Sequence, residues 1–161
     1  HLSMNMRIGQ TGVSLIEVLV SLLIMGIGLL GAAALQLNAL KFTDSSALTS
    51  QASFIAYDMM DRIRANPDGN YALANLDAAP TSNINDTRAQ DLADFAANAK
   101  AIGGVSAGSS IAVNNRVVTI TLQWSDARAT SAASVSGVQS NGDGLQTFTL
   151  TGRVAIDKGI K

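Results

Sequence analysis

The sequence predicts an α+β fold, in which a long N-terminal helix packs on a small antiparallel sheet together with one extra short helix. Three observations support this prediction. An uncharged apolar run extends from Val18 to Leu35. Apolar residues then recur every three or four positions towards Asn66, as on one face of a helix. Nearer the C-terminus the apolar period changes to two, which is the period of strands.

Composition narrows the possible functions. The chain has 161 residues, which suffices for one modest domain plus an appendage. Its net charge is −1, so no large field steers it to nucleic acid or anionic lipid. It has no cysteine and only His1, which excludes disulfides, thiolate zinc sites and the usual nucleophile–base pairs. We therefore expect no enzymatic activity, no catalytic residue, no cofactor and no metal site.

The apolar run has the length and composition of a membrane-spanning helix at the lower edge of the range. A secretory signal peptide would need a shorter apolar region and a clear small-residue cleavage site, for which Ala32–Ala34 is the nearest candidate. A plain signal anchor with Arg7 on the cytoplasmic side would explain the hydrophobicity. It would leave Glu17 unexplained, because a carboxylate at the mouth of a membrane span is costly unless something pairs with it.

The residues Gly12-Val13-Ser14-Leu15-Ile16-Glu17 precede this run. This segment closely resembles the N-terminus of type IV pilins and of type II secretion pseudopilins. The resemblance implies cleavage by prepilin peptidase after Gly12, with Val13 as the N-methylated mature N-terminus, although the family usually has Phe there. Glu17 would then pair with the new terminal amine of a neighbouring subunit and fix the register of assembly, because two buried charges are less costly when paired.

The resemblance also implies a division of the chain. His1–Ser3 precede two candidate start residues, Met4 and Met6, and we interpret them as a cloning remnant or an over-long start assignment. The long helix would extend for about 80 Å at 1.5 Å per residue. The expected parts are a leader at 1–12, the long helix at 13–66 with a membrane or filament-core part at about 13–37, and a globular head at 67–161.

A glycine motif inside the apolar run does not indicate a nucleotide site. Gly26 to Gly31 matches G-x-G-x-x-G, but no strand precedes it and no new helix opens after it. Small residues such as Gly28 and Ala32 instead let helices approach closely in a membrane. The glycines also weaken the helix, so local loosening is expected here in an assembled filament.

The second part of the long helix is amphipathic. Asp58 and Arg62 are four residues apart and are expected to form a weak surface pair. The Met59-Met60 doublet is expected to fill the core. Pro67 and Gly69 end the helix. The apolar stripe expected to pack under the sheet comprises Leu48, Ala52, Ile55, Met59 and Ile63.

The head begins with an expected loop from Gly69 to Asp86. Thr87-Arg88-Ala89-Gln90 resembles a capping box at the start of a short helix, which Gly103-Gly104 would stop. Asp91 and Asp94 on this helix are expected to be a solvated face and not a catalytic pair. The strands expected are 110–113 and 117–124 joined by a turn at Asn114-Asn115, a short strand near 135–138 within a 126–144 loop, and a last strand at 146–156, with Trp124 as a core or edge anchor.

Three segments resemble one particular group within this superfamily. They are the helix segment Ala56–Asn66, the Asp91-Leu92 helix ending in Gly-Gly, and the Val-Thr-Ile-Thr-Leu-Gln-Trp-Ser-Asp strand. They look like the PilV group of minor pilins. This implies a low-abundance subunit that primes or supports type IV pilus assembly and serves adhesion and twitching motility. Implied partners are other minor pilins, the major pilin, prepilin peptidase, the inner-membrane assembly platform and a tip adhesin. The implied location is the bacterial inner membrane, with a cytoplasmic N-terminus and a periplasmic head, and the filament or its tip.

Two alternatives remain open at this point. A minor pseudopilin of a type II secretion system shares the N-terminal motif and differs in its partners. A ligand-binding or DNA-binding pilus subunit would need clustered basic residues and stacking aromatics. Near the end of the sequence only Lys158 and Lys161 lie close together, so no nucleic-acid partner is expected.

Overall fold

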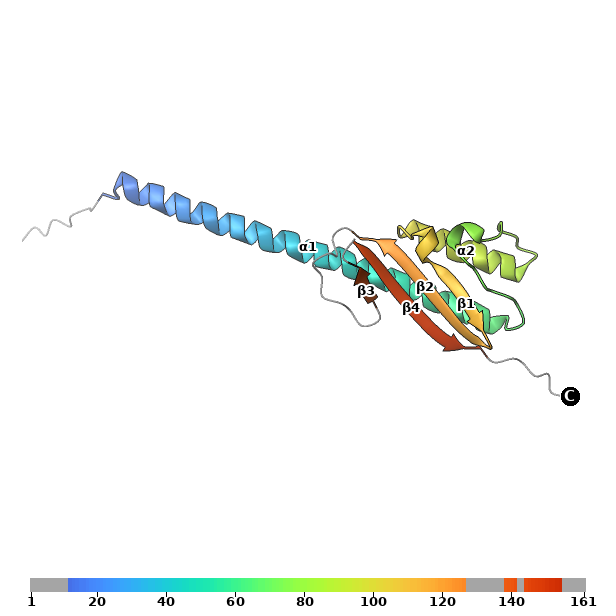
Figure 1. The fold of residues 1–161 in the computed structure, drawn as a ribbon. Coiled ribbons are helices and arrows are strands. Elements are labelled where there is room, and N and C mark those ends of the chain that lie inside the picture. The colour runs from blue at the N-terminus through green and yellow to red at the C-terminus, as the bar shows by residue number, and fades with distance from the viewer. Residues whose placement is uncertain (1–11, 127–137, 142–143, 155–161) are drawn as a thin grey trace, which may run out of the picture. The chain divides into compact units, whose positions relative to one another are not determined.

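The computed structural model describes residues 12–126, 138–141 and 144–154 (Figure 1). The chain divides into two compact units, His1–Ala39 and Leu40–Lys161. Helix α1 (Leu15–Ala65) contributes its first part to the first unit and the remainder to the second. The predicted leader at 1–11 lies outside the described residues.

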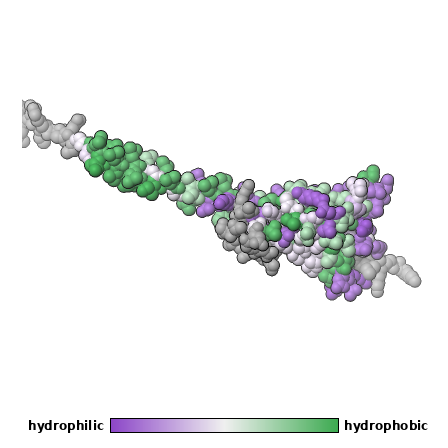
Figure 2. Space-filling model, turned by 45° about the horizontal axis from the view of Figure 1, so that its top comes forward, coloured by the Kyte–Doolittle hydropathy of each residue, from purple (hydrophilic) through white to green (hydrophobic). Residues whose placement is uncertain are grey.

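In the first unit, the described residues are the non-helical residues 12–14 and the apolar part of α1. Its large hydrophobic side chains are exposed along the whole length, and Figure 2 shows an almost continuous hydrophobic surface there. By length and composition α1 could cross a membrane. The helix runs without a break through Gly26, Gly28 and Gly31, where an added Cβ would meet no atom within 4 Å. The loosening expected in a filament therefore stays a prediction, while this helix surface is open for close approach by another helix.

The second unit contains an antiparallel sheet. Its described strands are β1 (Ser110–Asn114), β2 (Val117–Ser125), β3 (Val138–Asn141) and β4 (Leu145–Arg153). The strand order is β1-β2-β4-β3, and every neighbouring pair is antiparallel. In Figure 1 the C-terminal part of α1 passes behind this sheet. The α+β prediction of a long helix on a small antiparallel sheet is confirmed.

The core lies between the amphipathic part of α1 and one face of the sheet. Along β2 buried and partly exposed residues alternate, as expected when one face of a strand packs and the other meets solvent. Met59 and Met60 are buried, so their predicted role in filling the core is confirmed. Leu48 is only partly buried. The main buried contributors are Ala52, Ile55, Met59, Met60 and Ile63 of α1 and Val118, Ile120, Leu122 and Trp124 of β2.

Helix α2 (Thr87–Ala101) is the predicted short helix, but its N-cap was predicted wrongly. Asp86 is the N-cap, and its side chain accepts a hydrogen bond of 3.1 Å from the backbone N–H of Ala89. The capping-box prediction failed because Asp86 supplies a strong cap one residue before Thr87. The predicted stop is confirmed: Gly103 adopts φ +82°, a left-handed conformation that glycine tolerates without strain.

The strand boundaries differ slightly from the prediction. The β1–β2 turn is formed by Asn115 and Arg116, at φ +46° and +70°, one residue later than predicted. Asn114 still pairs with Val117, which leaves a two-residue loop whose positive φ angles are typical of hairpins. Strand β3 starts at Val138, and the predicted strand residues 135–137 lie outside the described residues. Strand β4 ends at Arg153, and residues 155–156 also lie outside them.

The predicted loop at 69–86 is not entirely irregular. It contains a 3₁₀ turn at Leu76–Ala78, and Leu73 forms a backbone bridge with Ile111 of β1. A second 3₁₀ turn at Ser106–Gly108 precedes β1. These contacts tie the connections to the sheet edge, so α2 is held against the same core.

Candidate functional site

The first site lies where α1 begins. Gly12, Val13 and Ser14 are non-helical, and the helix starts at Leu15, two residues later than predicted. The Ser14 carbonyl accepts from the N–H of Val18 at 3.3 Å, and its Oγ accepts from the N–H of Glu17 at 3.3 Å. Ser14 is therefore the N-cap of α1. This cap explains the later start, because an N-cap residue itself has a non-helical backbone.

Glu17 lies in the first turn of α1. A carboxylate there is favoured by the partial positive charge of the helix N-terminus. Within the described residues its carboxylate has no recorded hydrogen bond or ion pair, and the residue is exposed. The backbone carbonyl of Glu17 accepts a bond of 2.7 Å from the Ser21 hydroxyl, which stabilises the turn and leaves the carboxylate available.

Among the described residues, which begin at Gly12, no contact requires a glycine at this position. An added Cβ would meet nothing within 4 Å. Val13 is likewise exposed. Gly12, Val13 and Glu17 thus lie at one exposed helix end, and no packing contact among the described residues explains the glycine.

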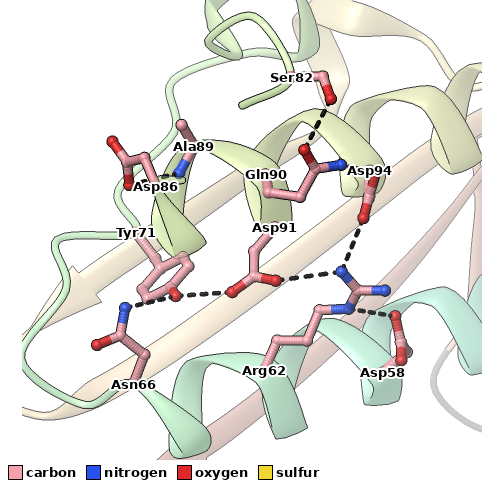
Figure 3. A network of polar contacts seen from close by, with 10 residues as sticks. All are labelled: Asp58, Arg62, Asn66, Tyr71, Ser82, Asp86, Ala89, Gln90, Asp91 and Asp94. Atoms are coloured by element: carbon pink, nitrogen blue, oxygen red, sulfur yellow. Dashed lines mark hydrogen bonds and ion pairs between the residues drawn. The ribbon is translucent and has the colours of Figure 1, made fainter. Parts of the chain in front are cut away.

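A second polar cluster joins α1 to α2 (Figure 3). Arg62 of α1 forms ion pairs with Asp58 at 3.0 Å, Asp91 at 3.1 Å and Asp94 at 3.0 Å. The second carboxylate oxygen of Asp91 accepts a bond of 2.8 Å from the Tyr71 hydroxyl. The predicted Asp58–Arg62 pair exists, but it is one part of a larger network that fixes α2 to α1.

The prediction that Asp91 belongs to a solvated face is wrong. Asp91 is only 8% exposed and sits within the network, whereas Asp94 is partly exposed. The sequence contained a signal for this burial. Asp91, Phe95 and Ala99 follow one another at spacings of four, so Asp91 continues a buried stripe of α2. Arg62 supplies the opposite charge that makes the buried carboxylate tolerable.

The network changes two proton affinities. Partial burial lowers the pKa of Arg62, but its bonds to Asp94 and Asp91 and the charge of Asp58 raise it above the usual value overall. Burial raises the pKa of Tyr71, and so does its hydrogen bond to Asp91, while the bond from Asn66 opposes this. Both groups thus stay protonated over the physiological pH range. Within the described residues no group of three His, Cys, Asp or Glu side chains is placed so that it could hold a metal ion.

Two family models match the chain. A model described as type IV pilin Tt1218 matches residues 34–101, and a model described as the prokaryotic N-terminal methylation motif matches residues 7–33. The chain belongs to the type IV pilin superfamily. The methylation-motif match contains Gly12, Val13 and Glu17, and the pilin match runs from the apolar part of α1 to the end of α2. Comparisons with curated proteins and with solved structures gave no match.

Proposed function

We propose that this pilin is a minor pilin of the PilV type, a non-enzymatic subunit that primes or supports type IV pilus assembly. The observation that carries the proposal is the exposed apolar part of α1 with Glu17 in its first turn, whose carboxylate has no ion pair within the described residues. An apolar helix surface of this extent needs lipid or other helices to cover it. The match to the N-terminal methylation motif over the same residues supports the proposal that this helix is processed and assembled as in a pilin.

The proposed chemistry begins with cleavage by prepilin peptidase after Gly12. Hydrolysis of the Gly12–Val13 peptide bond creates an α-amino group on Val13, which is then N-methylated. The amine is positive, and Glu17 is negative. A lone carboxylate would cost about 2.5–3.5 kcal/mol if it reached the bilayer centre. Pairing with an amine would reduce the cost of burying Glu17 in the assembled state. Pairing between subunits would set the register of each arriving chain.

The same interpretation places the chain in the bacterial inner membrane as a single-pass protein. Arg7 would stay on the cytoplasmic side, and the head would lie in the periplasm until assembly. Proposed partners are the prepilin peptidase, the inner-membrane assembly platform, the major pilin, other minor pilins and a tip adhesin. No chemistry is required of the head beyond docking.

The test replaces Glu17 with Gln, which keeps the side-chain shape and removes the charge. Asp68→Asn is the matched control, because Asp68 is an exposed carboxylate after the end of α1. We expect both variants to reach the membrane and only Glu17→Gln to be depleted from sheared filaments. Equal incorporation of Glu17→Gln and the control would refute the pairing. Recovery of the wild-type chain with secretion components and not with pilus components would assign it to a type II secretion machine.

A further inference from the structure

A buried donor without a partner lies near the C-terminal end of β2. Trp124 is fully buried, and its indole Nε1 has no hydrogen-bond partner among the described residues. The backbone of Trp124 is held on both sides, because it lies in register with Gln146 of β4 and forms an isolated bridge with Gly104. A buried N–H that gains no partner on folding costs about 1–3 kcal/mol. Such a group requires an explanation within the folded protein.

Two further polar residues are buried beside Trp124. Gln146 lies directly opposite it and is 6% exposed, and Asp126 follows it by two residues and is 5% exposed. Opposite residues of an antiparallel pair have Cβ atoms about 4.5–5.5 Å apart, and residues two apart on a strand share a face. The N–H of Asp126 donates to the Gly144 carbonyl at 2.6 Å, which extends the contact between the two chain segments past the last strand pair. An indole donor, a carboxylate and an amide therefore meet in one buried corner of the head.

The chemistry of this corner suits a small neutral molecule that both accepts and donates hydrogen bonds. The indole N–H can only donate, so it needs an acceptor. A cation beside it would face the positive end of the N–H dipole, and an anion would face the carboxylate of Asp126. Water meets both demands, because a buried water forms about three hydrogen bonds and a carboxylate can accept several at once. Gly144 adds no side chain that would occupy the space beside Asp126.

We propose that one internal water molecule bridges Trp124, Asp126 and Gln146. The water accepts from the Nε1–H of Trp124, donates one proton to the carboxylate of Asp126 and donates the other to the Oε1 of Gln146. It thereby ties the end of β2 to the start of β4 through side chains, just where the register between the two strands ends at Ser125 and Leu145. This site gives a physical role to the tryptophan and the aspartate that flank Ser125, and it does not depend on the proposed assembly function.

Nuclear magnetic resonance detects such a water directly. Trp124 is the single tryptophan, so its indole N–H gives one unambiguous resonance. The full-length chain, deuterated and ¹⁵N-labelled, is placed in detergent micelles, and magnetisation transfer from water to this proton is measured in NOE and ROE experiments. A long-lived internal water gives cross-peaks of opposite sign in the two experiments, whereas proton exchange with solvent gives the same sign. We expect opposite signs. The absence of a cross-peak, or equal signs in both experiments, would overturn the proposal.

Variants of the two acceptors check the assignment of the partners. Asp126→Leu keeps a branched side chain without polar atoms, and Asp126→Asn is the matched control because it retains an acceptor oxygen. We expect the water cross-peak to be lost in Asp126→Leu and kept in Asp126→Asn. Gln146→Met keeps the side-chain length and removes the amide, so it should weaken the same cross-peak even where Asp126→Leu does not fold. A cross-peak unchanged by both Asp126→Leu and Gln146→Met would contradict a water bridged by these residues.

Discussion

The network around Arg62 predicts a graded loss of stability when its aspartates are removed one at a time. The three carboxylates contact the same guanidinium at nearly equal distances of 3.0–3.1 Å. They differ in exposure, because the side chain of Asp91 is 11% exposed, that of Asp94 38% and that of Asp58 41%. Since solvent screens exposed pairs, burial and not distance should decide the coupling energies.

The magnitudes follow from this difference. A hydrogen bond to a charged group in a shielded site contributes about 1.5–3 kcal/mol, which we assign to the Arg62–Asp91 coupling. Exposed ion pairs contribute about 0.2–1 kcal/mol, which we assign to the couplings of Arg62 with Asp94 and Asp58. Replacing Arg62 alone should cost more than the coupling with Asp91, because it also leaves that carboxylate buried without its cation.

Double-mutant cycles measure these couplings directly. The variants are Arg62→Ala combined in turn with Asp91→Ala, Asp94→Ala and Asp58→Ala, in the full-length chain in detergent. Trp124 is the single tryptophan and is fully buried, so its fluorescence reports urea unfolding of the head. Equal couplings for the three aspartates, or a coupling of Asp91 below that of Asp94, would refute the argument from burial.

Four further predictions use the same unfolding assay or helical circular dichroism. Asp86→Ala should destabilise the head by about 1 kcal/mol, because it removes the N-cap of α2, whereas Thr87→Ala should cost less than about 0.5 kcal/mol. A larger loss of stability for Thr87→Ala would show that Thr87 is the N-cap, as the capping-box prediction had it. Gly104→Ala should cost about 1–3 kcal/mol, because its methyl group would overlap a backbone carbonyl of α2; a neutral effect would contradict that packing. Gly28→Ala should stabilise α1 by about 1 kcal/mol in the isolated chain, since nothing opposes the added methyl, and a loss of helicity would count against open space there. Folding raises the pKa of Tyr71, so the contribution of its protonated hydroxyl to the stability of the head is complete below the unfolded pKa of about 10 and is lost as pH rises through the higher folded pKa. Tyr71→Phe should therefore flatten the loss of stability at alkaline pH. An unchanged loss would show that other groups cause it.

Much of the fold was predictable because its signals are periodic and local. The uncharged run and the later stripe through Met59 defined α1, and the alternation from Val117 to Trp124 defined β2. Gly103 marked the end of α2 because the chain needs a left-handed residue there. The errors at the α2 cap and the β1–β2 turn are of one residue, where two adjacent residues compete for the same role, and α1 starts two residues later than predicted. Asp86 outcompeted Thr87, and Asn115 with Arg116 formed the turn expected one residue earlier.

The polar network could not be derived from the sequence in the same way. Arg62 and Asp91 are separated by 29 residues, and no local rule states which face of α2 meets α1. The available signal was that Asp91 lies on an otherwise apolar stripe of α2. This pattern fits either a carboxylate at the solvated edge of the helix or a buried carboxylate in an ion pair.

At the N-terminal site, in contrast to the polar network, the sequence supplied most of the prediction and the structure adds less. Its residues were predicted from the sequence and stay a prediction. The structure adds the Ser14 cap and an exposed Glu17 whose carboxylate has no hydrogen bond or ion pair among the described residues. Together these observations support a helix end adapted to events outside the isolated chain. Cleavage would supply the amine, and assembly would bring the carboxylate to it.

The most direct test of this account is the intact mass of the chain recovered from sheared filaments. We predict a species that begins at Val13 and carries one added methyl group, present in filaments as well as in membranes. A chain in filaments that still contains the leader, or that begins at any other residue, would contradict the account. So would a chain processed at Val13 that never leaves the membrane when filaments are made.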